Sequence, residues 1–294
     1  MHRRRPRHGR SSISSSRATA RSGSLPADLL RRRLLRGTWR TAGYVLGGGL
    51  LAFLVIPVIA LFVTGSPTDW LAGLRHPITA PAMLLSLVTT VLSLGVLVAF
   101  GTPLAWWLGR SEARAARLVE TVVQLPIVVP PAVAGLALLL AFGRRGLLGP
   151  LLQGLNIDIA FSTIAVVLAQ VFVAAPFYIQ AATTAFAGID ENLLVVARTL
   201  GARPATVLFR VALPLARRGL IAGAALAWAR ALGEFGATLM FAGNLSGRTQ
   251  TLPLAVYTAL ESDVRAAQAL AVLLVVIALV IIIFLRPRRG RHRR

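Results

Sequence analysis

Two opposite charges, Arg230 and Glu234, lie inside the long apolar run from Gly219 to Phe241. Each alone would oppose insertion at the centre of a span by roughly 2.5–3.5 kcal/mol, so such residues are rare. Their four-residue spacing places them on one helix face, where they could neutralise one another or bond neighbouring helices, although arginine before glutamate is the weaker order. They could instead border a polar route through the membrane. The sequence leaves both accounts open.

Other chemistry is excluded by residue types that the chain lacks. All 32 basic residues are arginine, and without lysine there is no phosphate-loop lysine, no Schiff base and no anchor for pyridoxal phosphate. The absence of cysteine excludes disulfides, iron–sulfur clusters and thiolate zinc sites. His2, His8, His76 and His292 all lie outside the apolar runs, which leaves no imidazole for a metal or a proton relay in the bilayer. We therefore expect no catalytic, metal or cofactor site in this chain.

The elements that must position these residues are membrane spans. Hydrophobic residues make up 56% of the 294 and charged residues 14%, whereas a soluble chain would need roughly 25% charged residues. Six apolar stretches are each long enough, at about 20 residues, to cross the hydrocarbon as helices. They are Gly43–Val63, Leu84–Leu108, Val122–Phe142, Thr163–Phe186, Gly219–Phe241 and Ala267–Leu285. The sequence predicts an all-α polytopic membrane protein, with a transmembrane domain over residues 43–285. Prolines 126, 130 and 131 should kink the third span or delay its start.

The net charge of +22 comes from arginines that are distributed unequally about the spans. With the N-terminus inside, the inner segments hold 26 arginines and the outer loops five, which predicts that both termini are cytosolic. Residues 1–42 should form a disordered basic tail, although an organelle transit peptide has a similar composition, and residues 286–294 should form a second basic tail. Arginines beside spans lie along anionic headgroups. We therefore expect membrane lipid, and not nucleic acid, as the partner of this charge.

The longest inner connection, residues 188–218, has a helical pattern but is not apolar enough to enter lipid. Asp190 can cap a first helix, and Gly201 can end it in left-handed geometry. Pro204 suits the first turn of a second short helix, which Pro214 should stop. Two helices joined by a glycine turn also describe a DNA-binding helix-turn-helix, but the adjoining spans leave no third helix to support one. The pattern predicts that something docks on this loop.

This loop resembles the cytosolic Glu-Ala-Ala loop in the inner-membrane permease subunits of binding-protein-dependent ABC importers. The resemblance rests on residues 195–201, Val-Val-Ala-Arg-Thr-Leu-Gly, followed by Val-Ala-Leu-Pro at 211–214. The glycine and the Leu-Pro pair match in spacing, whereas Val195 and Val196 stand where the family has its glutamate and first alanine. In that family the loop presents a coupling helix to the ATPase subunit. The residues that this implies here are Val195, Ala197, Leu200, Gly201, Ala202, Val211, Leu213 and Pro214.

The resemblance covers roughly residues 84–285 and leans toward the molybdate branch of the family. Its most specific stretch is residues 230–253, from Arg-Ala-Leu-Gly-Glu-Phe-Gly-Ala-Thr to Thr-Leu-Pro, and residues 130–146 lean the same way. It implies a type I ABC importer permease bundle in a bacterial inner membrane. Its partners would be a second copy of the chain, two ATPase subunits that use the ATP, and an extracytoplasmic molybdate-binding protein.

The resemblance also implies two further sets of residues. Candidates for the translocation path are Arg230, Gly233, Glu234, Gly236 and Thr238. Here a positive group would help an oxyanion to enter, and the carboxylate would keep it from binding too well. Candidates for docking the binding protein are Arg248, Thr249 and Gln250, in an outer loop whose apolar part, residues 252–260, could lie along the membrane surface.

Alternative functions remain within and outside this family. A sulfate, thiosulfate or tungstate permease would carry an oxyanion of similar kind, and the sequence shows no residues that select among them. An ion-coupled secondary transporter ordinarily needs carboxylates or histidines within its spans, and only Glu234 qualifies. A membrane-embedded enzyme would need a second acid-base or metal-binding group in the spans, which the sequence does not provide.

Overall fold

The computed structural model describes residues 27–285, with side chains from 43 to 284, and this part of the chain is built from helices joined by short turns. The chain divides into two compact units, residues 1–58 and 59–294. The described part of the first unit belongs to α1 (Ala27–Val63), which continues into the second unit. This helix includes residues 27–42, which the sequence predicted to be part of a disordered tail. Their leucines, arginines and alanines are strong helix formers, which outweighs their charge. Residues 1–26 and 286–294, the rest of the two predicted tails, lie outside the described residues.

Long apolar helices dominate the second unit. Three of them, α3 (Thr79–Arg110), α7 (Thr163–Ala187) and α13 (Val264–Leu285), are spans close to their predicted places. Five helices in the described residues are long and apolar enough to cross a membrane, and a bent pair of helices would make a sixth span. The predicted class, an all-α polytopic membrane protein with about six spans, is confirmed.

The third predicted span is that bent pair. It consists of α4 (Arg114–Val128) and α5 (Pro131–Phe142), which meet at an angle of 117°. Consecutive prolines at 130 and 131 explain the break, because neither can donate a backbone hydrogen bond and each restricts the residue before it. A short helix, α6 (Gly149–Gly154), follows on the way to α7.

The fifth predicted span differs at both ends. It begins earlier, because α9 (Pro204–Thr206), the π-helical segment η1 (Val207–Ala212) and α10 (Leu213–Leu232) form one continuous 29-residue helix. The prediction that Pro214 stops the second loop helix is therefore wrong. The wider π-helical turn before Pro214 changes the hydrogen-bond register that a proline would otherwise break. The span also ends earlier, at Leu232, and α11 (Gly236–Ala242) is a separate helix.

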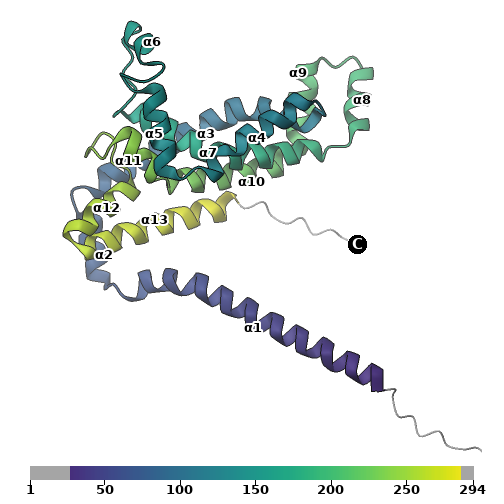
Figure 1. The fold of residues 1–294 in the computed structure, drawn as a ribbon, viewed down its shortest axis with the longest axis horizontal. Helices are drawn as coiled ribbons and strands as arrows, with labels where there is room; N and C mark the ends of the chain where they lie inside the picture. The colour runs from purple at the N-terminus through teal and green to yellow at the C-terminus, as the bar shows by residue number, and fades with distance from the viewer. Residues whose placement is uncertain (1–26, 286–294) are drawn as a thin grey trace, which may run out of the picture. The chain divides into compact units, whose positions relative to one another are not determined.

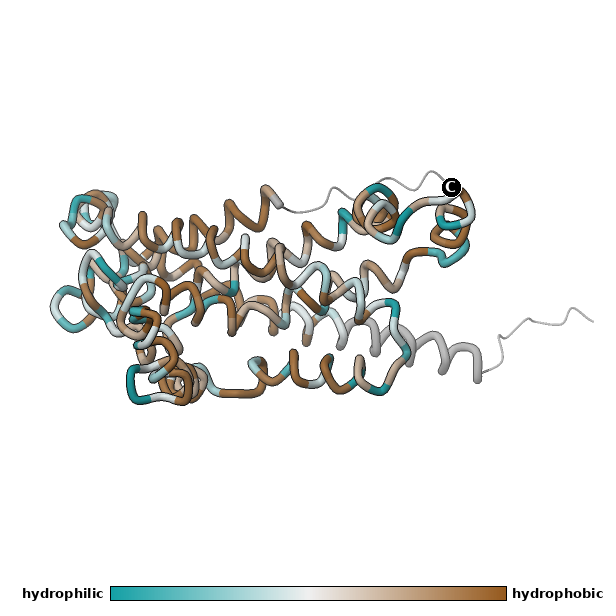
Figure 2. Tube along the Cα trace, turned by 90° about the horizontal axis from the view of Figure 1, so that it is seen from above, coloured by the Kyte–Doolittle hydropathy of each residue, from teal (hydrophilic) through white to brown (hydrophobic). Residues whose placement is uncertain are grey.

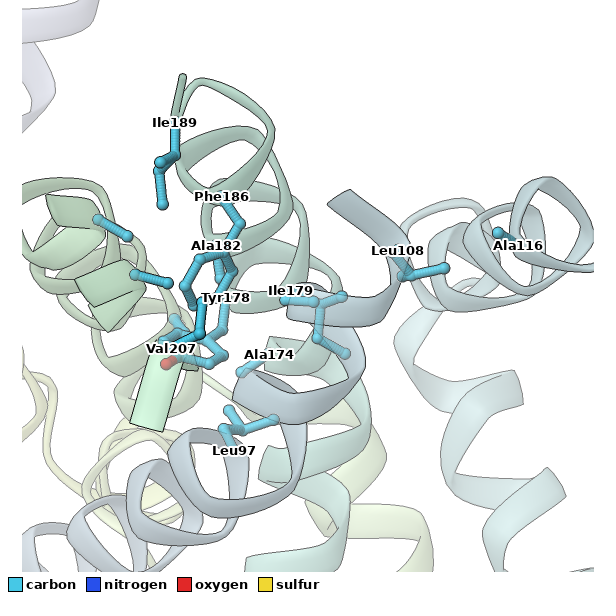
Figure 3. Packing of buried hydrophobic residues seen from close by; sticks show 14 of the residues in the cluster. Leu97, Leu108, Ala116, Ala174, Tyr178, Ile179, Ala182, Phe186, Ile189 and Val207 are labelled. Carbon is cyan, nitrogen blue, oxygen red and sulfur yellow. The ribbon is translucent and has the colours of Figure 1, made fainter. Parts of the chain in front are cut away.

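Within the second unit, α3, α7 and α10 pack side by side around one core (Figures 1 and 3). The approach of α10 to α7 is close, since a Cβ added to Gly223 would lie 2.7 Å from the Cβ of Ala181. At one end of the bundle lie α9 and α8 (Glu191–Thr199), and at the other lie α2 (Pro67–Arg75), α6, α11 and α12 (Leu252–Ser262). Hydrophilic residues gather at these two ends, and the helices between them are mostly apolar (Figure 2).

The apolar stretch at 252–260 forms most of α12, which has a buried face, while Tyr257 and Leu260 are exposed. Leu252, Leu254 and Ala255 are fully buried. Leu252 and Ala255 share a core with Ala82 of α3 and Leu270 of α13. Hydrophobicity alone could not distinguish a helix on the membrane surface from one packed inside the protein.

Candidate functional site

A break in the chain between α10 and α11 carries the two intramembrane charges. The sequence at the break is Leu-Gly-Glu-Phe-Gly, and its two glycines weaken a continuous helix at this point. Glu234 then starts the next helix, because its Oε1 accepts a hydrogen bond of 2.7 Å from the backbone N–H of Ala237. A carboxylate at a helix N-terminus satisfies a free N–H group and complements the helix dipole.

Arg230 and Glu234 form an ion pair with an Nη1–Oε2 distance of 2.8 Å. The carboxylate side chain is only 1% exposed, and both of its oxygens have a partner. The arginine side chain remains 28% exposed. Glu234 therefore pairs with Arg230 and caps α11, whereas the Arg230 side chain keeps an accessible part.

The two interrupted spans pack against each other at this place. A Cβ added to Gly236 would lie 2.8 Å from the Cβ of Pro131, and one added to Gly135 would lie 2.6 Å from the carbonyl oxygen of Ala237. These contacts join α11 to α5, so the break in the third span faces the break in the fifth. Irregular backbone at membrane depth is tolerated where it is buried in protein or lines a polar cavity. The predicted path residues thus mark a junction of two broken helices.

The other predicted path residues differ in exposure. Gly233 is exposed, Gly236 is half-buried, and Thr238 is fully buried. The Thr238 hydroxyl has no hydrogen-bond partner among the described residues. The structure therefore brings Arg230, Glu234 and Gly236 together around one break. The Thr238 side chain, in contrast, is buried inside the folded chain.

A row of buried polar side chains between α3 and α7 was missed from the sequence. Ser93 Oγ donates to Gln170 Oε1 at 2.8 Å, and Gln170 Nε2 donates to Thr89 Oγ1 at 3.1 Å. Near the outer end of α3, the backbone N–H of Leu252 donates to Ser86 Oγ at 2.7 Å and so fixes the start of α12. A signal was present, because Ser86, Thr89 and Ser93 recur at three- and four-residue spacing on one helix face.

The loop at the arginine-rich end follows its local predictions closely up to Pro204. Asp190 caps α8 by accepting a 2.9 Å hydrogen bond from the N–H of Asn192, and Gly201 has φ +82°. Pro204 is the first residue of α9. These predictions from capping rules are confirmed.

The same loop exposes several apolar side chains. Leu200 is 82% exposed, and Leu193, Val195 and Val196 are about half exposed. Only Leu194 of α8 is fully buried, and it anchors the helix in the core shared with α7 and η1. An exposed apolar face of this kind indicates a surface that another molecule covers.

This face is concave. A groove of about 400 Å³ lies between α8 and the start of α10, and it is lined by Leu193, Val196, Ala197, Leu200, Arg210, Val211, Pro214 and Leu215. It brings together four of the predicted coupling residues, Ala197, Leu200, Val211 and Pro214, with four that were not among them. Of the remaining predicted residues, Ala202 and Leu213 pack against the core behind it, Gly201 forms the turn, and Val195 is half exposed outside the groove.

The loop after α11, which the sequence predicts to be on the outer side, has the opposite character. Of its predicted docking residues, Arg248 is exposed, but Thr249 and Gln250 are buried. Thr249 Oγ1 accepts a 2.9 Å hydrogen bond from the N–H of Leu245, and Gln250 Nε2 donates to Thr258 of α12 at 3.2 Å. Their side chains therefore hold the loop in shape, and only Arg248 offers its side chain to a partner.

A second outer feature lies between α5 and α7. Arg144 pairs with Asp158 through Nε–Oδ1 and Nη2–Oδ2 hydrogen bonds of 3.0 and 2.8 Å, which lower the pKa of the Asp158 carboxyl below its usual value. This pair borders a shallow cavity of about 300 Å³ together with Gln153, Asn156 and Ile157. Because both charged side chains are well exposed, the pair is screened by water and fixes the loop only weakly.

The structure is that of a polytopic membrane protein. Long apolar helices cross it, two broken spans pack together beside a partly buried ion pair, and a helical hairpin exposes an apolar groove. Residues 101–286 match the family described as binding-protein-dependent transport system inner membrane components, and the chain belongs to this family. The family resemblance predicted from the loop and the fifth span is confirmed.

Relatives with a high identity cover most of the chain. The molybdenum transport system permease protein ModB of Mycobacterium tuberculosis (strain ATCC 25618 / H37Rv) is 45% identical over 233 residues, which cover 79% of this chain and 88% of the relative. The protein of the same name from Escherichia coli (strain K12) is 40% identical over 220 residues, which cover 71% of this chain and 96% of the relative.

Solved structures share the fold at lower identity. A bacterial alginate ABC transporter, in complex with an alginate pentasaccharide-bound periplasmic protein, has a chain that matches with a TM-score of 0.63 and 18% identity, covering 89% of this chain and 95% of that one. An inward-facing MetNI methionine ABC transporter matches with a TM-score of 0.54 and 20% identity, covering 69% and 91%. The predicted ABC importer permease bundle is confirmed at the level of the fold.

Proposed function

We propose that this chain is the permease subunit of a molybdate importer that is driven by separate ATPase subunits. The observation that supports molybdate as the substrate is the likeness of this chain to a molybdenum transport permease, 45% identical over a stretch that covers 79% of the chain. By family we infer a homodimer, two ATPase subunits and an extracytoplasmic molybdate-binding protein. The complex would lie in a bacterial inner membrane with both termini cytosolic. In this proposal the chain itself binds neither ATP nor another cofactor.

The groove between α8 and α10 supports the ATPase docking. The continuous helix from Pro204 to Leu232 has 29 residues and is about 43 Å long, against roughly 30 Å of hydrocarbon. Arg217 and Arg218 suit the inner membrane edge, so residues 204–215 would project into the cytosol. Apolar side chains exposed there do not meet lipid tails. They are suited to a protein partner, and Arg198, Arg203 and Arg210 favour acidic residues on it.

The break between α10 and α11, next to Arg230, supports the proposal that the anion passes here. The Arg230 side chain remains 28% exposed while its Nη1 is held by Glu234. A fixed, partly desolvated positive group at a junction of broken helices can offer charge to a passing dianion without a closed binding site. In this proposal Glu234 positions Arg230, and Gly233 and Gly236 permit the break.

The test is uptake of labelled molybdate by proteoliposomes that contain the complex recovered with the tagged chain. Removing Arg230 alone would leave the buried Glu234 carboxylate without its cation and could prevent folding. We therefore specify the double variant Arg230→Met/Glu234→Gln, in which the glutamine oxygen can still accept from Ala237. Uptake should fall by at least about tenfold in the assembled complex. The comparison variant, Glu234→Gln, keeps the arginine without its ion pair and should lose less uptake than the double variant.

Two results would contradict the proposal in different ways. Normal uptake by the double variant would remove Arg230 from the path while leaving the transport function intact. Competition with sulfate and tungstate tests the substrate, and a wild-type complex that carries sulfate but not molybdate would overturn that assignment.

A further inference from the structure

The last residue of α3, Arg110, is held in an unusual way for an arginine at the edge of a span. Its Nη2 donates a 3.0 Å hydrogen bond to the backbone carbonyl of Ile189, 79 residues further along the chain. Its guanidinium carbon lies 5.5 Å from the ring centre of Trp106, one helical turn earlier, within the range of a cation–π contact. An arginine that only anchored topology would extend into water or headgroups.

The surroundings of Arg110 restrict it further. Trp106 meets Phe186 of α7 edge to face with ring centres 5.2 Å apart. At the intervening Gly109 a Cβ would lie 2.8 Å from the carbonyl oxygen of Thr183, so the ends of α3 and α7 touch through backbone. The Nε–H of Arg110 is buried and has no hydrogen-bond partner among the described residues. The side chain is therefore partly desolvated and aimed at one acceptor.

That acceptor lies at the root of the loop that carries the groove. Ile189 is in the turn between α7 and α8, directly before Asp190, the residue that caps α8. Ile189 and Leu194 belong to the same buried cluster, and Figure 3 shows Ile189 beyond Phe186 at the end of α7. A displacement of α8 would thus act on the Ile189 carbonyl and, through Arg110, on α3.

We propose that Arg110 is a positioning residue that ties the ATPase-docking helix α8 to the span α3. Through this tie, a movement of α8 is transmitted mechanically to the spans. This inference rests on the proposed function. Arginine is suited to the role because its planar group can stack on Trp106 and donate sideways to a carbonyl at the same time, and because it stays charged. Lysine offers only a point charge on a flexible stem.

The test compares transport with ATP use in the reconstituted complex. Arg110→Met keeps an apolar stem against Trp106 but removes the donor and the charge. Arg114→Met and Arg117→Met are matched controls, because they remove the same charge from exposed positions on the same inner segment. We expect Arg110→Met to lower molybdate uptake per ATP hydrolysed by roughly five- to tenfold, with ATP hydrolysis and ATPase association within about twofold of wild type. Both controls should keep the wild-type ratio.

Two further measurements separate positioning from general stability. Backbone amide exchange in α8 should be faster in Arg110→Met, with no change in α13. Arg110→Lys should have an intermediate ratio of uptake to hydrolysis, since it can restore one donor but not the stacking.

The outcomes decide the proposal as follows. A wild-type ratio in Arg110→Met, or equal losses of uptake and hydrolysis, would overturn the role of Arg110 while the importer function stood. If Arg110→Met does not assemble, Arg110→Lys decides: a reduced ratio supports the role and a wild-type ratio overturns it. Failure of the wild-type complex to carry molybdate would instead contradict the proposed function.

Discussion

The predicted inner loop, residues 188–203, and the predicted outer loop, residues 243–251, differ in which side chains they expose. The inner loop leaves apolar groups such as Leu200 and Val196 exposed and forms a groove with them. The outer loop buries polar groups, Thr249 and Gln250, and satisfies them with hydrogen bonds inside the protomer. Both segments were predicted to dock a partner.

This contrast indicates which motif residues are available to contact a partner. An apolar group exposed to water has an unfavourable hydration free energy, which contact with a partner or with lipid removes. A buried, hydrogen-bonded polar group stabilises its own fold and has little left to offer. On this basis we propose that the inner loop docks its partner through apolar side chains, whereas the outer loop offers its shape and one arginine.

The largest effect should come from a charge placed in the inner groove. Leu200→Asp changes a side chain that is 82% exposed, so the fold should be unaffected. Burying the new carboxylate against a partner would cost several kcal/mol, enough to weaken ATPase association by roughly a hundredfold or more. Co-purification of the ATPase subunits with the tagged chain, followed by titration in detergent, measures this.

Asn192→Asp is the matched control for that variant. It adds the same charge to α8 at an exposed position that does not line the groove, and at the helix N-terminus, where a negative charge is favourable. Equal losses of ATPase association in the two variants would show that charge on α8 matters and the groove does not.

A smaller effect is expected in the outer loop, where a substitution should lower the thermal stability of the complex. Thr249→Val keeps the shape of a fully buried side chain but leaves the N–H of Leu245 without its acceptor. The cost should be about 1–3 kcal/mol, which lowers the thermal midpoint by several degrees, roughly 2–4 °C per kcal/mol. Thermal unfolding of the purified complex, followed by light scattering or dye binding, measures the shift.

Arg248→Gln sharpens the same comparison, because this neighbour is exposed. It should leave the thermal midpoint unchanged and should weaken association of the binding protein by a few-fold, about the worth of one rim charge. If Thr249→Val weakened that association without lowering the midpoint, the division between shape and contact in this loop would be wrong.

Much of the fold could be predicted because length and apolarity decide where spans lie. The core of α3, all of α7 and most of α13 came from hydropathy, and the break before Pro131 came from proline chemistry. The end of α10 could not be predicted in this way. Glycine, phenylalanine and alanine keep the run apolar through Phe241, while the break depends on packing against α5 and on the cap from Glu234.

In the candidate site, too, the features that depend on local sequence could be predicted and those that depend on tertiary packing could not. Local rules gave the cap at Asp190 and the left-handed Gly201, since each depends on only a few neighbouring residues. The groove requires α8 to lie across the start of α10, and the hold of Arg110 on Ile189 joins residues 79 positions apart. Tertiary contacts of this kind leave no periodic signal in a single sequence.

The smallest effect should come from restoring the glutamate that the family has at position 195. Val195 is 46% exposed and does not line the groove, so Val195→Glu should neither fill nor block it. The new carboxylate can pair with Arg198 one turn later on α8, which is worth only a few tenths of a kcal/mol. ATPase affinity, measured by titration in detergent, should therefore change by about twofold or less. A gain of tenfold or more would show that the partner presents a cation at this position, and that the loop docks through charge more than through its apolar groove.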